Sequence, residues 1–112
     1  MDDNRFGKTT IAQDVLISIA RLTTLNVQGV KSTSPFVTSY DRIVTKPENE
    51  GVKVAVKDNL VFVDLYVILE SDVNVRVVSK NIQLNVSRAI SDMVGMEVGS
   101  INIHICDIAY NA

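Results

Sequence analysis

The segment from Leu60 to Leu69, LVFVDLYVIL, constrains the fold of this 112-residue chain more than any other part of the sequence. It has the length and the aliphatic and aromatic content of a β-strand, and Asp64 is its one charged residue. Successive side chains of a strand turn to opposite faces, and here both faces are apolar. Such a strand is usually covered on both sides, so the rest of the chain is expected to pack around it. One face holds only aliphatic residues: Val61, Val63, Leu65, Val67 and Leu69.

The residues before this segment predict its antiparallel partner. From 52 to 57 the sequence VKVAVK alternates valine with lysine or alanine, which is the period of a strand. Asp58 and Asn59 follow as a two-residue turn, since asparagine tolerates the positive φ that tight hairpin turns require. We therefore predict a β-hairpin of residues 52–57 with 60–69.

A first amphipathic helix is predicted to end near Leu25. Its start has two alternatives. Thr10 and Gln13 fit a capping box, which places the start before Gln13. Otherwise the helix begins near Gln13, with Asp14 in its first turn and residues 8–11 as a short strand. The apolar residues at helical spacing, expected to face the core, are Val15, Ile19 and Leu22.

A second helix is predicted from about 73 to 94. Asp72 is the expected N-cap, and Gly95 is expected just beyond the last turn. The apolar stripe expected to face the core is Val75, Val78, Ile82, Val86, Ala89, Ile90 and Met93. The residues expected to face water are Arg76, Lys80, Asn81, Arg88 and Asp92.

Two more strands complete the predicted fold. Residues 30–37 form one, and Pro35 places it at an edge because proline donates no ladder hydrogen bond. Residues 97–109 form the last, and a change of alternation near Gly99 indicates a bulge. The predicted class is α+β, with two helices packed on one face of a small, mainly antiparallel sheet, in the order β-α-β-β-β-α-β.

One face of the predicted sheet is expected to be uncovered by the helices. Two helices cover one face, so the other presents Phe62, Tyr66 and Ile68 to water, around Asp64. An exposed apolar patch usually marks a partner or self-association surface. The alternative is that a mobile loop, predicted at about 38–51, folds over this face. We predict an interaction face formed by Phe62, Asp64, Tyr66 and Ile68.

Composition limits the class of protein. A chain of 112 residues favours one domain over residues 1–112. The net charge of −2 and the lack of a G-x-x-G loop argue against a nucleic-acid partner. The start, MDDNRFGKTT, does not have the pattern of a secretory signal. No apolar run reaches the roughly 20 residues that span a bilayer, so no direct membrane insertion is expected.

The residue types needed for catalysis or metal binding are scarce. One His and one Cys cannot supply the three or four ligands of a zinc site. His104 and Cys106 share a strand face with Cβ atoms roughly 6.5–7 Å apart, and Asp107 is expected on the opposite face. A half-buried histidine beside a small apolar cysteine is the preferred interpretation over a nucleophilic pair. No phosphate-binding glycine loop occurs. No enzyme activity, cofactor or metal is predicted.

Asp64 interrupts an apolar strand, where a carboxylate needs hydrogen-bond partners or water. One interpretation is a polar group that sets specificity inside an interface. The preferred alternative is a residue at an edge or under a loop that bonds a neighbouring amide or lysine.

The order of these motifs resembles the bacterial alkaline shock protein family, whose members are also described as general-stress or cell-envelope-related proteins. The resemblance extends over nearly the whole chain outside residues 32–50, and Asp64, Gln83 and Asn102 match motif positions. Its motifs are FGKTTIAQDV (6–15), the Gly29-Val30 step, GVKV (51–54), VFVDLYVIL (61–69), NIQLNV (81–86) and GMEVGSINIHI (95–105).

The resemblance implies a non-catalytic protein of stress or cell-envelope homeostasis, located in the cytoplasm or held at the membrane by a partner. Family members include self-associating proteins, proteins anchored by a small integral membrane protein, and proteins linked to lipid metabolism. It therefore implies a protein-interaction domain that acts as a homo-oligomer or an adaptor. The alternative is a regulator that binds an enzyme of lipid or acyl metabolism. The role it implies for Asp64, Gln83 and Asn102 is structural: buried polar groups that fix strand and helix register.

Overall fold

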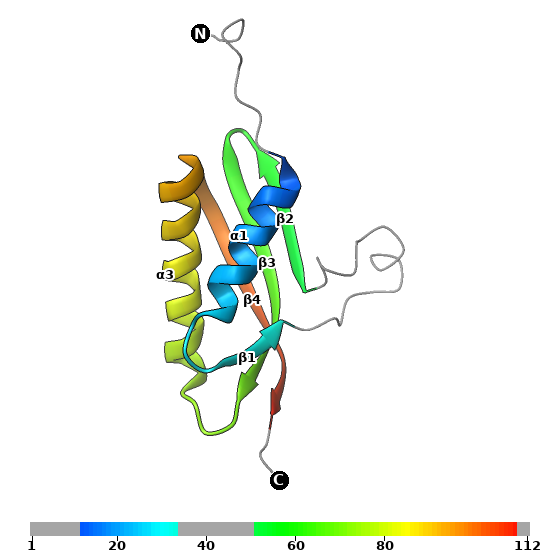
Figure 1. The fold of residues 1–112 in the computed structure, drawn as a ribbon, viewed down its shortest axis with the longest axis vertical. Coiled ribbons are helices and arrows are strands. Elements are labelled where there is room, and N and C mark those ends of the chain that lie inside the picture. The colour runs from blue at the N-terminus through cyan, green and yellow to red at the C-terminus, as the bar shows by residue number, and fades with distance from the viewer. Residues whose placement is uncertain (1–11, 34–50, 110–112) are drawn as a thin grey trace, which may run out of the picture.

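The computed structural model describes residues 12–33 and 51–109, and these hold two helices and four strands (Figure 1). The predicted strand at 8–11 and nearly all of the predicted loop at 38–51 lie outside the described residues. No helix in these two ranges is long and apolar enough to cross a membrane. The elements are α1 (Gln13–Leu25), β1 (Val30–Thr33), β2 (Val52–Lys57), β3 (Leu60–Glu70), α3 (Val75–Val94) and β4 (Glu97–Ala109).

Strand β3 is the centre of the sheet. Strand β2 pairs antiparallel with its first half, from Leu60 to Leu65, and β1 pairs antiparallel with residues 67–69. Strand β4 pairs parallel with β3 along its whole length. A strand has two hydrogen-bonding edges, and β4 occupies one edge of β3. Strands β1 and β2 therefore lie one after the other along its other edge. Two of the three pairings are antiparallel, as the predicted class requires.

The predicted hairpin of β2 and β3 is confirmed. Asp58 and Asn59 join the strands with φ values of 54° and 66°. Positive φ at both central positions is the geometry of the tight turn that matches strand twist. The register pairs Lys57 with Leu60, so the alternation of β2 turns its valines to the same side as the aliphatic face of β3.

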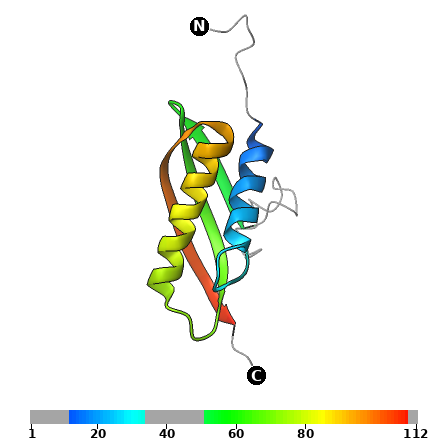
Figure 2. The same cartoon turned by 60° about the vertical axis from the view of Figure 1, so that its left-hand side comes forward.

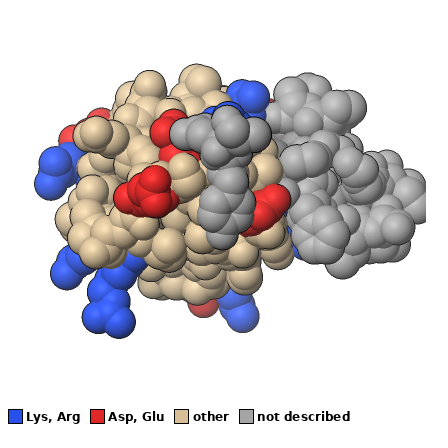
Figure 3. Space-filling model, turned by 90° about the horizontal axis from the view of Figure 1, so that it is seen from below, with Lys and Arg blue, Asp and Glu red and all other residues tan. Residues whose placement is uncertain are grey.

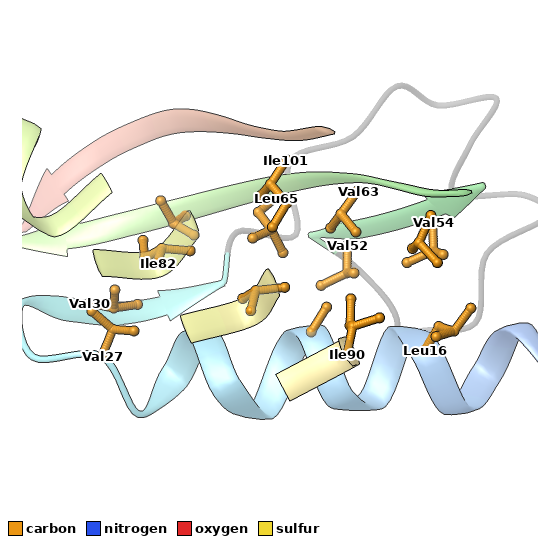
Figure 4. Close-up of a cluster of buried hydrophobic side chains, with 14 of the residues drawn as sticks. Leu16, Val27, Val30, Val52, Val54, Val63, Leu65, Ile82, Ile90 and Ile101 are labelled. Carbon is orange, nitrogen blue, oxygen red and sulfur yellow. The ribbon is translucent and has the colours of Figure 1, made fainter. Parts of the chain in front are cut away.

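The helices cover one face of the sheet, and the core lies between them and β3 (Figure 2, Figure 4). All five aliphatic residues of the predicted inner face of β3 have 0% exposure. The outer side chains of β3 lie on the opposite face, which neither helix covers. Other core residues come from every described element and include Leu16, Val30, Val52, Ile82 and Ile101.

The predicted inner face of α1 is wrong. Leu16, Ala20 and Thr24 are each 0% exposed, whereas Val15 and Leu22 are 45% and 56% exposed. The helix has apolar residues on two sides, so periodicity did not select between them. The sheet packs against the side with the small residue Ala20. The polar Thr24 is tolerated there because its hydroxyl donates to the Ala20 carbonyl at 2.7 Å.

The start of α1 is the second of the two predicted alternatives. The helix begins at Gln13, and no side chain caps its first turn. Gln13 does not close a capping box, because its side-chain amide donates to the Val54 carbonyl of β2. This bond ties the first turn of the helix to the sheet.

Helix α3 starts later than predicted. Asn74, not Asp72, is the N-cap, and its side chain accepts from the Val77 backbone N–H at 3.0 Å. Asp72 has φ 65° and belongs to the turn before the helix. Gly95 ends the helix in the left-handed conformation at φ 72°, as predicted.

The predicted stripe of α3 is confirmed at its centre and wrong at its ends. The buried members are Val78, Ile82, Val86 and Ile90. Val75, in the first turn, and Met93, in the last, are 37% and 69% exposed. All five residues predicted to face water on this helix are exposed.

Strand β4 has the predicted limits and two bulges. Val98 pairs with Val61 and Ser100 with Phe62, so Gly99 is the extra residue of the predicted bulge. A second bulge, which the sequence did not indicate, leaves Cys106 unpaired between Ile105 and Asp107. Because of it, Asp107 is in register with Ile68, and its predicted position on the face opposite His104 is wrong.

We predict that Leu65→Ala lowers the free energy of unfolding by about 3 kcal/mol, because it leaves a cavity at a fully buried position of β3. The matched change Leu22→Ala, at a leucine that is 56% exposed, should stay within about 0.5 kcal/mol of wild type. Urea unfolding monitored by circular dichroism measures both. Equal losses in the two variants would contradict this arrangement of the core.

Candidate functional site

The sheet face that the helices leave uncovered carries the four residues of the predicted interaction face. Phe62, Asp64, Tyr66 and Ile68 alternate along β3 with the buried aliphatic residues, and each is partly buried. The sequence predicted that this face is open to water, whereas each side chain is only partly exposed, because neighbours on the same face cover part of it. We call this surface, Phe62, Asp64, Tyr66 and Ile68 with the adjoining residues of β4, the open sheet face.

The Phe62 ring packs against the bulge in β4 at Gly99. A Cβ atom built on Gly99 would be 2.5 Å from Cε1 of this ring and 2.8 Å from its Cζ. Real Cβ atoms do not come so close, so the ring occupies the space that a side chain at this position would need. The glycine of the bulge therefore lets an aromatic ring pack on backbone, which covers part of its apolar surface.

Asp64 is the centre of a polar cluster. Its Oδ1 accepts from the side-chain amide of Asn102 at 3.2 Å and lies 3.2 Å from Nε2 of His104. The parallel register places Asp64 opposite Asn102, and His104 follows two residues later on the same face of β4. The predicted bond to a neighbouring amide agrees with this geometry, and the histidine is a second partner that the sequence did not reveal. The predicted edge position is wrong, because β3 has paired strands on both of its edges.

Tyr66 and His104 form an aromatic stack beside this cluster. Their ring centroids are 4.4 Å apart and the ring planes differ by 12°. Tyr66 is opposite His104 in the β3–β4 register, so one strand partner holds the face of the imidazole while Asp64 holds its edge. His104 is thus fixed by two residues of β3, with 45% of its side chain exposed.

The cluster brings together polar and aromatic groups that can form binding contacts. Within residues 12–33 and 51–109, no group of three His, Cys, Asp or Glu side chains could hold a metal ion. Cys106 is exposed, and its Sγ contacts the His104 carbonyl at 3.9 Å rather than the imidazole. An aromatic ring, a carboxylate and an amide on one surface are typical of contacts that combine apolar area with directed hydrogen bonds.

Charge is distributed unevenly at the end of the molecule where β3 and β4 finish. In the end view of Figure 3, acidic side chains lie near the centre and basic side chains project mainly at the rim. The acidic residues of the segments at this end are Glu70, Asp72 and Asp107.

The model of the alkaline shock protein 23 family, which is described as having a cell envelope-related function, matches residues 1–110. The chain belongs to this family. The match confirms the resemblance inferred from the order of the sequence motifs, and it gives the chain the family's cell-envelope-related function.

Proteins of two bacteria are similar to this chain along most of their length. The chain is 29% identical over 112 residues to the uncharacterized protein YqhY of Bacillus subtilis, covering 98% of this chain and 83% of that protein. It is 32% identical over 108 residues to the uncharacterized protein Spy1535 of Streptococcus pyogenes, covering 94% and 81%.

The fold is similar to that of a solved structure named MamM-CTD H264A. The TM-score is 0.52 at 9% sequence identity, with 90% of this chain and 100% of that chain covered. At this identity the likeness concerns the fold alone.

The three polar residues that match motifs of the alkaline shock protein family lie in two regions: the open sheet face and the contact between α3 and β4. Asp64 and Asn102 bond each other on the open sheet face. Gln83 lies on α3 and donates to the Ile101 carbonyl of β4 at 3.0 Å, so it ties helix to strand. The expected role in fixing register agrees with both bonds, although Gln83 and Asn102 are exposed rather than buried.

We predict that Gly99→Ala lowers the free energy of unfolding by about 1–2 kcal/mol, because the new methyl group forces the Phe62 ring off the strand. In a Phe62→Ala background the same change should cost less than about 0.5 kcal/mol, since the ring is absent. A double-mutant cycle by urea unfolding measures the difference. An equal cost in both backgrounds would mean that the ring does not lie over the glycine.

We predict a weak coupling between Asp64 and His104, of about 0.5 kcal/mol, because water screens side chains that are 38% and 45% exposed. The measurement is a cycle of Asp64→Ala, His104→Ala and the double variant, by urea unfolding in low salt. A coupling of several kcal/mol would mean that the pair is a core element and not a surface contact.

Proposed function

We propose that this member of the alkaline shock protein family is a non-catalytic protein-interaction domain of cell-envelope and stress homeostasis, which self-associates or acts as an adaptor through its open sheet face. The observation that carries the proposal is the asymmetry of β3. Its inner side chains are fully buried, whereas its outer side chains lie on a face that no described element covers.

Burial of this face gives association its driving force. Phe62, Tyr66 and Ile68 form an apolar strip along the central strand, and aromatic side chains contribute strongly at interfaces. The Phe62 ring already packs against Gly99 and the Tyr66 ring already stacks on His104, so both lose little conformational freedom on docking.

The polar cluster gives the contact its specificity. A partner that covers Asp64 removes water from its carboxylate, and Asn102 and His104 already supply two hydrogen-bond contacts to it. A wrong partner leaves buried polar atoms unpaired, which costs free energy.

We predict that the double variant Phe62→Ser, Tyr66→Ser remains folded and weakens self-association by at least about tenfold, because it removes the aromatic contact area. Sedimentation equilibrium over a range of concentrations measures the dissociation constant. The control is Leu22→Ser on α1, an exposed apolar residue remote from the face, which should associate as wild type does.

An unchanged association constant in the folded double variant would show that the open sheet face is not the contact. If the wild type is monomeric at all concentrations, self-association is excluded, and crosslinking in the native cell with membranes retained tests the adaptor role. Recovery of a small integral membrane protein, lost in the double variant, supports an adaptor. Recovery of a lipid-metabolism enzyme supports a regulator instead.

A further inference from the structure

A second surface lies at the outer edge of the sheet, away from the open sheet face. Here α3 and β4 form a groove of about 270 Å³. Its walls are mainly apolar, and Leu84 in the wall is 51% exposed although leucine is usually buried. An apolar cavity of about 150 Å³ already admits a benzene-sized group, so the groove accommodates aliphatic side chains. Its lining residues are Lys80, Gln83, Leu84, Ser87, Val98 and Ile101.

The strand beside this groove has an unpaired edge. Strand β4 pairs with β3 on one side, and no strand of the described residues pairs with the other. Between its bulges at Gly99 and Cys106, residues 100–105 form a regular stretch. The Ile101 carbonyl in this stretch receives its hydrogen bond from the Gln83 side chain, in the place of a neighbouring strand. An edge of this kind is a template for strand addition.

The helix beside the groove is basic. Arg76, Lys80 and Leu84 follow one another at intervals of four residues and are all exposed, so they form one ridge along the first half of α3. No salt bridge joins Arg76 or Lys80 to a carboxylate in the described part of the chain. Basic side chains project from the α3 side of the molecule in Figure 3. The ridge stands out in a chain of net charge −2.

The groove, the unpaired edge of β4 and the basic ridge together define the chemistry of a peptide that could bind here. An extended peptide that pairs with residues 100–105 turns alternate side chains toward α3. Apolar side chains of such a peptide would contact Leu84 and Val98. Carboxylates on it would meet Arg76 and Lys80, and the acidic residues of β4, Glu97 and Asp107, stand outside this stretch.

We propose that the groove between α3 and β4 binds an extended acidic and apolar peptide segment of a partner protein, which adds to the outer edge of β4 as a strand. The backbone of the segment pairs with residues 100–105, and its carboxylates contact Lys80 and the rest of the ridge. This is a mode of recognition in which main-chain bonds give affinity and side-chain pockets give selectivity. It is independent of the open sheet face.

The test uses fluorescent eight-residue peptides that alternate Leu, Val or Ile with Asp or Glu, and counterparts with Lys at the acidic positions. Fluorescence anisotropy with the full chain should show binding of acidic peptides and about tenfold weaker binding of basic ones. Leu84→Asp and Lys80→Glu should each weaken acidic-peptide binding by about tenfold. The control Leu22→Asp adds the same charge at an exposed leucine of α1 and should leave binding unchanged.

Amide hydrogen exchange then tests strand addition itself, with protection expected on residues 100–105. Binding without protection there would overturn the proposal, and so would equal losses in Leu84→Asp and Leu22→Asp. Vesicles of phosphatidylglycerol, an anionic lipid, test whether the basic ridge binds a membrane instead of a peptide. Vesicle binding that Lys80→Glu abolishes, with no acidic peptide bound at millimolar concentration, would assign the ridge to a membrane and overturn the peptide proposal.

Discussion

The burial of one face of β3 is the interaction on which the rest of the structure depends. Five aliphatic side chains on this strand are completely buried, and each contributes about 1.5–3 kcal/mol relative to exposure. The positions of the other strands and of the helices follow from the position of β3. Strands β1 and β2 satisfy one edge of β3, β4 satisfies the other, and the two helices cover the aliphatic face. Neither helix covers the opposite face of the sheet, and no other element of residues 12–33 and 51–109 does.

The uncovered face is adapted to partial exposure. Phe62 lies on the glycine of the β4 bulge, Tyr66 stacks on His104, and Asp64 holds the imidazole and the Asn102 amide. These contacts reduce the apolar area in water and satisfy the carboxylate. They also hold the side chains in fixed positions, so a partner meets a preorganised surface.

Two surfaces with different chemistry follow from one topology. The open sheet face offers aromatic area and a central carboxylate, whereas the α3–β4 groove offers a strand edge beside two cations, Arg76 and Lys80. If both surfaces bind as proposed, one domain joins two protein partners. The family to which the chain belongs is described as having a cell envelope-related function.

Local features of this protein were determined by its sequence alone. The β2–β3 hairpin, the left-handed glycine after α3 and the bulge at Gly99 all follow from neighbouring residues, whose φ preferences and alternation act over a few positions. The tertiary structure decided which side of α1 is buried, because both sides are apolar and only packing against the sheet separates them. It also decided the cluster of Asp64, Asn102 and His104. The parallel register of β3 and β4 joins residues 38 and 40 positions apart, and no local preference specifies such a pairing.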